Sequence, residues 1–160
     1  MRLLLLSVGR LKAGPERDLA ARYEERAAAG ARAARLTGFE ARAVEESRAR
    51  RAEDRKAEEA KALLAMVPPG AVLIALDERG RSLASEALAA EIGKARDAGA
   101  PAFALALGGP DGHDGSLRAA ARMSLAFGAM TWPHQLVRIL AAEQLYRAVT
   151  ILSGHPYHRA

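Results

Sequence analysis

The sequence has no cysteine, few aromatic residues and no long apolar run, and each of these absences narrows what the protein can be. Without cysteine the chain forms neither a disulfide framework nor a thiolate metal site, which is usual for proteins of a reducing compartment. No segment approaches the roughly 20 consecutive apolar residues that a membrane span requires. Aromatic residues make up only 4% of the chain, so we expect a core packed through small aliphatic side chains. We therefore expect a cytoplasmic protein that uses neither a membrane nor a metal ion.

The residues that are present indicate one folded domain, which we expect to span 1–160. With 160 residues, of which 50% are hydrophobic, the chain is long enough for a substantial core and too apolar to be disordered. The net charge of +5 favours a polyanionic partner, and the abundant arginines suit phosphate because their planar fork donates two hydrogen bonds at once. A genome rich in G and C, whose codons favour arginine and alanine, explains the same composition. Charge alone therefore does not establish RNA binding.

Apolar runs alternate with helical stretches along the chain. The runs that predict strands lie at 3–8, 36–44, 71–76 and 102–107, and the first of them is too short for a signal peptide. The stretches that predict helices lie at 15–29, 47–67, 84–98, 117–122 and 133–152. Strands separated by helices predict an α/β fold, with a mostly parallel sheet covered by helices on both faces. Such sheets bind ligands beyond the carboxyl ends of their strands, which here indicates 77–81, 108–115 and the segment after Met123.

Two of these loops carry residues suited to a ligand. The glycine loop, GGPDG at 108–112, lets a ligand approach the backbone closely because adjacent glycines have no Cβ. It matches neither a dinucleotide fingerprint nor a P-loop, and an ordinary turn is the alternative. The segment FGAMTW at 127–132 is able to wrap an apolar or aromatic ligand with its backbone groups exposed. The alternative there is a buried strand in which Thr131 caps the next helix.

The last helix carries further candidates. Its spacing predicts a buried apolar stripe made of Leu136, Leu140, Leu145, Val149 and Leu152. His134 and Arg138 lie four residues apart, so they share a face that is able to contact RNA. Glu143 and Arg147 have the same spacing, and an ion pair within the helix is the simplest explanation for them.

The tail HPYHR, residues 155–159, is dense in functional side chains. Tyr157 is able to stack on a base, Arg159 to bind phosphate, and a histidine to move a proton near neutral pH. The two histidines, His155 and His158, lack an evident third ligand, so we expect no metal there. A frayed terminus is the alternative for this segment.

Taken together, these pieces resemble the RlmH family, ribosomal RNA methyltransferases of the SPOUT class. The segments that carry the resemblance occur in the family's order and spacing: VLIALDERG, LALGGPDG, MTWPHQLVRILAAEQLYRA and HPYHR. The opening LLLLSVGRLK is similar as well, so the likeness spans nearly the whole chain. Three features depart from the pattern: 11–50 matches loosely, Asp111 stands where many relatives have Glu, and Ala160 follows the usual terminal basic residue.

The resemblance carried by these segments implies a C-terminal trefoil knot, a homodimer with the active site at its interface, and S-adenosylmethionine as methyl donor. It implies transfer of the methyl group to N3 of a pseudouridine in helix 69 of large-subunit ribosomal RNA, with the ribosome as partner. Carried over by position, the cofactor-binding residues are Leu76, Gly108, Phe127, Gly128, Ala129, Met130, Thr131 and Trp132. We expect the RNA-binding residues to be His134, Arg138, His155, Tyr157 and Arg159.

The mechanism expected from these residues needs no metal, because the positive charge of a sulfonium donor disperses as its methyl group leaves. Positioning of the acceptor nitrogen matters most, and its imide proton must be removed. We expect Tyr157, His158 and Arg159 to close over the target base from the partner subunit, with His158 as the proton acceptor and Glu143 as an alternative base. Two other readings stay open: a non-catalytic basic RNA-binding assembly factor, and a SPOUT methyltransferase with another RNA target.

Overall fold

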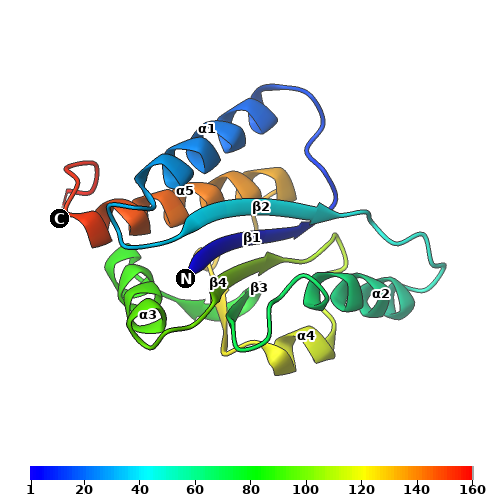
Figure 1. Cartoon of the computed structure of the whole chain (residues 1–160). Coiled ribbons are helices and arrows are strands. Elements are labelled where there is room, and N and C mark those ends of the chain that lie inside the picture. Colours follow the sequence, from blue (N-terminus) through cyan, green and yellow to red (C-terminus); the bar gives the residue numbers. More distant parts are fainter. Residues whose placement is uncertain (160) are drawn as a thin grey trace.

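The strands of the protein form one parallel sheet in the order β2-β1-β4-β3-β5, as the computed structural model of residues 1–159 shows (Figure 1). The strands are β1 (Arg2–Val8), β2 (Gly38–Val44), β3 (Val72–Ser82), β4 (Ala102–Leu107) and β5 (Met123–Ala126). The helices are α1 (Pro15–Gly30), α2 (Ala52–Leu64), α3 (Ser85–Asp97), α4 (Gly115–Ala120) and α5 (His134–Ser153). The predicted α/β architecture is confirmed. Ala160, the residue after the terminal arginine, lies outside the described residues.

Helices cover both faces of the sheet because its strands are apolar on both sides. In β1, Leu3 and Leu5 pack into one core cluster, whereas Leu4 and Leu6 pack into the other. The first cluster includes buried residues of α3 and α5, and the second includes buried residues of α2 and α4. In Figure 1, α1 and α5 accordingly lie on one side of the sheet and α2 and α4 on the other.

Some boundaries differ from the sequence prediction for local reasons. The helix predicted from Ser47 begins only at Ala52, because the backbone N–H of Ser47 donates to Glu59 and draws residues 47–51 into a loop along α2. The apolar segment after Met123 is a strand only as far as Ala126. The predicted stripe on α5 is wrong at Leu136, which is 41% exposed.

The chain passes tightly over β5 at Gly80. Leu125 is in register with Leu76 of β3 and again with Arg81, so the register shifts between these two residues. A Cβ on Gly80 would lie 2.6 Å from the backbone N and C of Leu125, so this crossing has room only for glycine. The trefoil knot implied by the resemblance stays a prediction.

Helix α5 connects the edge of the sheet at which the strands end to the C-terminal tail. Its 20 residues rise about 30 Å, at roughly 1.5 Å per residue. The helix begins beside the carboxyl ends of the strands, and the tail follows it at the opposite end (Figure 1). None of the helices in the described part of the chain is long and apolar enough to cross a membrane.

Candidate active site

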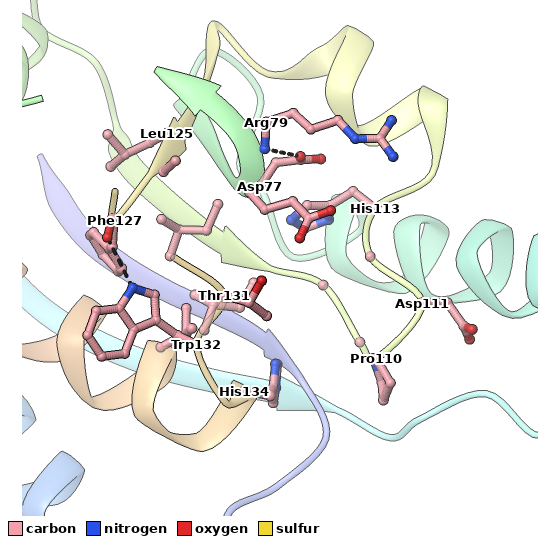
Figure 2. Close-up of a pocket in the computed structure, with 18 of the residues that line it drawn as sticks. Asp77, Arg79, Pro110, Asp111, His113, Leu125, Phe127, Thr131, Trp132 and His134 are labelled. Carbon is pink, nitrogen blue, oxygen red and sulfur yellow. Dashed lines mark hydrogen bonds between the residues drawn. The ribbon is translucent and has the colours of Figure 1, made fainter. Parts of the chain in front are cut away.

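A cavity of about 600 Å³ opens where β4 and β5 end and beside the middle of β3, at the edge of the sheet that the sequence pattern predicted. Its walls are residues 77–79 in the middle of β3, the loop 108–113 after β4, and the segment 126–132 at the end of β5 (Figure 2). The start of α5 contributes His134 and Val137. The volume lies within the range of about 300–1,000 Å³ that is usual for small-molecule sites.

The glycine loop presents backbone to this cavity because side chains do not fit there. A Cβ on Gly108 would lie 2.9 Å from the carbonyl carbon of Gly112, and one on Gly109 would lie 2.7 Å from Oε2 of Glu59. Gly112 has a φ of +80°, which favours glycine, and its N–H donates to the Gly109 carbonyl at 2.9 Å. The loop is therefore a tight, glycine-dependent turn that leaves its backbone accessible.

Arg55 of α2 anchors the glycine loop from outside. Its Nε and Nη2 donate to the two carboxylate oxygens of Asp111 at 2.7 and 3.0 Å, a two-point ion pair. Its Nη1 donates to the carbonyls of Ala49 and Arg50, both at 3.1 Å. The hydrogen bonds from Arg55 lower the pKa of Asp111, so this carboxylate is ionised at neutral pH. Asp111 therefore reaches a basic partner on α2.

His113 is a buried group that the sequence analysis did not single out. It is only 4% exposed, and its Nε2 lies 3.1 Å from the Ala106 carbonyl, which can only accept, so Nε2 carries the proton. Burial lowers the pKa of His113. Arg118 donates to the His113 carbonyl at 2.7 Å and to Asp77 at 3.4 Å, which connects two walls of the cavity. The only sign of His113 in the sequence is its position directly after the glycine loop.

The third wall is the loop 127–132, whose first and last residues are joined by a hydrogen bond. Trp132 Nε1 donates to the Phe127 carbonyl at 3.1 Å (Figure 2), and Gly128 has a φ of +95° that permits the turn between them. Met130 is 74% exposed and Trp132 is 41% exposed, so two large apolar side chains lie at the surface beside the cavity. Here the strand alternative fails, because the residues after Ala126 form no strand.

The structure gathers the expected cofactor residues around one cavity. Leu76, Gly108, Phe127, Gly128, Met130, Thr131 and Trp132 all line it, and of the expected set only Ala129 does not. The topology had indicated Asp77, Glu78 and Arg79 in general terms, and they line it too. Lys56 of α2 was not expected there, because the pattern does not show where α2 lies.

The two α5 residues that we expected to bind RNA contact backbone carbonyls at the end of β1. His134 Nε2 lies 3.1 Å from the Val8 carbonyl, and Arg138 Nη1 donates to the Gly9 carbonyl at 3.1 Å. Burial lowers the pKa of Arg138, whose Nε is buried and has no partner within residues 1–159. These contacts attach the β1–α1 turn to the start of α5. An RNA-binding role for His134 and Arg138 stays a prediction.

The tail packs at the far end of α5 and is not frayed. Tyr157 donates to Oε1 of Glu143 at 3.0 Å, and its ring lies 4.6 Å from that of Tyr146. Burial first, and then this hydrogen bond, raise the pKa of Tyr157. No described residue of 155–159 lines the cavity of its own chain. The cofactor residues and the expected catalytic residues thus do not share one cavity within a single chain.

Among residues 1–159, no three His, Asp or Glu side chains gather in a way that would hold a metal ion. The cavity instead combines exposed backbone, the apolar side chains of Leu76, Leu107 and Leu125, and the carboxylate of Asp77. Lys56, Arg79 and Arg118 line it as well, so the lining suits a small molecule with an aromatic group and charges of both signs.

Comparisons with known proteins agree with this chemistry. A family model described as "Predicted SPOUT methyltransferase" matches residues 1–158. The ribosomal RNA large subunit methyltransferase H of Methylocella silvestris is 58% identical over 159 residues, which cover 99% of each chain. Proteins of the same name from Beijerinckia indica and Methylorubrum populi are 54% and 59% identical over 160 residues, covering at least 97% of each chain. The chain therefore belongs to the SPOUT methyltransferases, in the RlmH family that its motifs resemble.

Proposed function

We propose that the protein methylates large-subunit ribosomal RNA, at N3 of a pseudouridine in helix 69, with S-adenosylmethionine as methyl donor. The relatives that match along their whole length are named as large-subunit ribosomal RNA methyltransferases. The observation that carries the proposal is the single cavity shared by the glycine loop and the 127–132 segment. We place this activity in the cytoplasm and in one domain that spans the chain.

The residues around the cavity fit S-adenosylmethionine. The glycines at 108 and 109 let the loop fold tightly against Gly112 and Glu59, and both line the cavity with backbone against which a nucleoside is able to lie. Leu76, Phe127 and Val137 offer apolar side chains for an adenine ring. Asp77 and Glu78 place carboxylates at the wall, and Lys56, Arg79 and Arg118 place cations there, so charges of both signs face a ligand that carries a sulfonium, an ammonium and a carboxylate group.

We infer that the active form is a homodimer in which the tail of one subunit completes the cavity of the other. Within one chain no described residue of the tail lines the cavity, and the tail instead contacts Glu143 and Arg147 of α5, so we place its action at the cavity of the partner. The exposed Met130, Trp132 and Leu136 give the cavity rim an apolar surface that a second subunit would cover.

When bound, the methyl donor supplies an electrophilic methyl group at a sulfonium. The chain's own residues then hold the acceptor nitrogen in line and exclude water, because reacting groups must be held near contact distance. The imide proton of the target base must leave before or during transfer. Arg159 of the tail, exposed at the surface, is suited to hold a phosphate or the anionic oxygen that results. His158 and Glu143 are the two side chains that the sequence offers as bases, and both make hydrogen bonds within their own chain.

Two experiments test the proposal. Calorimetric titration with S-adenosylmethionine should give saturable heat, whereas an assembly factor without catalytic activity would give none. Mass spectrometry of ribosomal RNA from a deletion strain should then show loss of one methyl group at a pseudouridine of helix 69. Loss of a methyl group from another nucleotide, or from transfer RNA, would instead identify a different target.

A further inference from the structure

His158 lies between two charged side chains from different helices. Arg147 of α5 donates from Nη1 to His158 Nδ1 at 3.3 Å, and His158 Nε2 lies 2.9 Å from Oε1 of Glu86 on α3. The contact with Glu86 joins residues that are 72 positions apart in the sequence. Neither α3 nor this contact belongs to the cavity, because Glu86 does not line it.

These two contacts determine the protonation of the ring. A guanidinium only donates hydrogen bonds, so Nδ1 must accept; a carboxylate only accepts, so Nε2 must carry the proton. Both nitrogens of the His158 ring are therefore used, Nδ1 toward Arg147 and Nε2 toward Glu86. An added proton on Nδ1 would point at the guanidinium of Arg147.

Arg147 also holds the other side chains of this region. It donates to Oε1 of Glu143 from Nε at 3.0 Å and from Nη2 at 2.6 Å. Its guanidinium carbon lies 4.9 Å from the centre of the Tyr157 ring. Glu143 in turn accepts from the Tyr157 hydroxyl. One arginine thus contacts both Tyr157 and His158, and it stabilises the turn that carries Arg159.

We propose that Arg147 and Glu86 are positioning residues for the methyl transfer. In this proposal His158 has a structural role, as a brace that holds the tail in place, and is not the base that takes the imide proton. This inference rests on the proposed function, because it concerns the tail that would enter the partner's cavity. Arg147 and Glu86 fix the ring of His158 from two sides, and Tyr157 is fixed by Glu143. Arg159 is left to reach the substrate from a rigid turn, and the imide proton leaves to water.

Glu86 offers the sharpest test because it is 54% exposed and its substitution does not disturb the core. Glu86→Ala removes the acceptor for His158 Nε2, whereas Glu86→Gln keeps an oxygen there. We expect Glu86→Ala to lower kcat about tenfold, with KM for the RNA and binding of S-adenosylmethionine unchanged within about twofold. Glu86→Gln should restore kcat to within about twofold of wild type. Glu91→Gln is the matched control, since Glu91 lies on the same helix but pairs with Lys94 and Arg122 and not with the tail.

A second measurement needs no RNA. Hydrogen exchange of the backbone amides of 157–159 should accelerate in Glu86→Ala and in Arg147→Lys, and should stay slow in Glu86→Gln and Glu91→Gln. Wild-type kcat in Glu86→Ala, equal damage by Gln and Ala, or unchanged exchange in Glu86→Ala would each overturn the proposal. If the wild-type protein methylated no ribosomal RNA, the proposed function would fail. The exchange comparison would still test whether Glu86 and Arg147 hold the tail in place through His158.

The variant His158→Gln distinguishes a structural role of His158 in the tail from a role as general base. The glutamine amide is able to donate to Glu86 as Nε2 does, so we expect kcat to fall by less than about tenfold with an unchanged pH profile. A general base contributes about 10²- to 10⁴-fold. A loss above about a hundredfold, together with loss of the acidic limb of the pH profile, would show that His158 takes the proton and would overturn the assignment.

Discussion

Replacing Gly108 by alanine should weaken cofactor binding by a steric route that the structure makes explicit. The new Cβ would lie 2.9 Å from the Gly112 carbonyl carbon, 3.0 Å from its oxygen and 3.2 Å from the His113 nitrogen. All three neighbours are backbone atoms, so the loop itself must shift. Overpacking of this kind costs about 1–3 kcal/mol. If the shift occurs within the binding surface, that cost corresponds to roughly 5- to 150-fold weaker binding of S-adenosylmethionine.

Gly115→Ala is the matched control for this substitution. A Cβ on Gly115 meets no atom within 4 Å, and the residue begins α4 without a positive φ. We expect this variant to bind S-adenosylmethionine as the wild type does in isothermal calorimetry. Thermal unfolding of both variants separates a local effect from loss of the fold. Wild-type affinity in Gly108→Ala, with an unchanged melting temperature, would refute the claim that ligand lies against this loop.

Further predictions concern pH, the anchor of the glycine loop and the dimer. Burial lowers the pKa of His113 from its ordinary 6.5, so the unfolded chain binds the extra proton first. The free energy of unfolding, measured in urea, should therefore fall as pH drops below about 6.5. The variant His113→Gln should lose that dependence. An equal slope of unfolding free energy against pH in wild type and variant would contradict this. Arg55→Gln leaves Asp111 without its two-point partner, so binding of S-adenosylmethionine should weaken about three- to tenfold in calorimetry; unchanged affinity would show that the anchor is dispensable. Leu136→Glu should convert dimers to monomers in analytical ultracentrifugation, and an unchanged sedimentation profile would place the interface elsewhere.

The sequence predicted best what depends on local pattern. Aliphatic runs such as Leu3–Leu6 mark buried strands because both faces of a parallel sheet are covered, and the alternation of strands and helices then locates the ligand edge. The cavity accordingly formed where it was expected. Gly99 directly follows the helix predicted over 84–98, and its positive φ of 79° is the conformation in which glycine commonly ends a helix.

The sequence pattern does not predict contacts between segments that are far apart in the chain. Arg55 and Asp111 are 56 residues apart, and nothing in their spacing shows that α2 lies beside the glycine loop. Leu136 matches the apolar stripe of α5 yet is exposed, because periodicity marks an apolar face without saying whether this chain or another covers it. The bracing of His158 by Glu86 similarly depends on how α3 packs against α5, and sequence alone suggested a base instead.

The central claim is that one subunit supplies the cofactor cavity and its partner supplies the tail. It is tested most directly by mixing two inactive variants, one with a bulky substitution in the cavity (Gly108→Val) and one without the tail arginine (Arg159→Ala). Mixed dimers would keep one intact site, so random exchange of subunits should restore about a quarter of wild-type methylation. If the mixture stays as inactive as either variant alone, while mass spectrometry confirms that mixed dimers form, the tail does not act across the interface and the account is wrong.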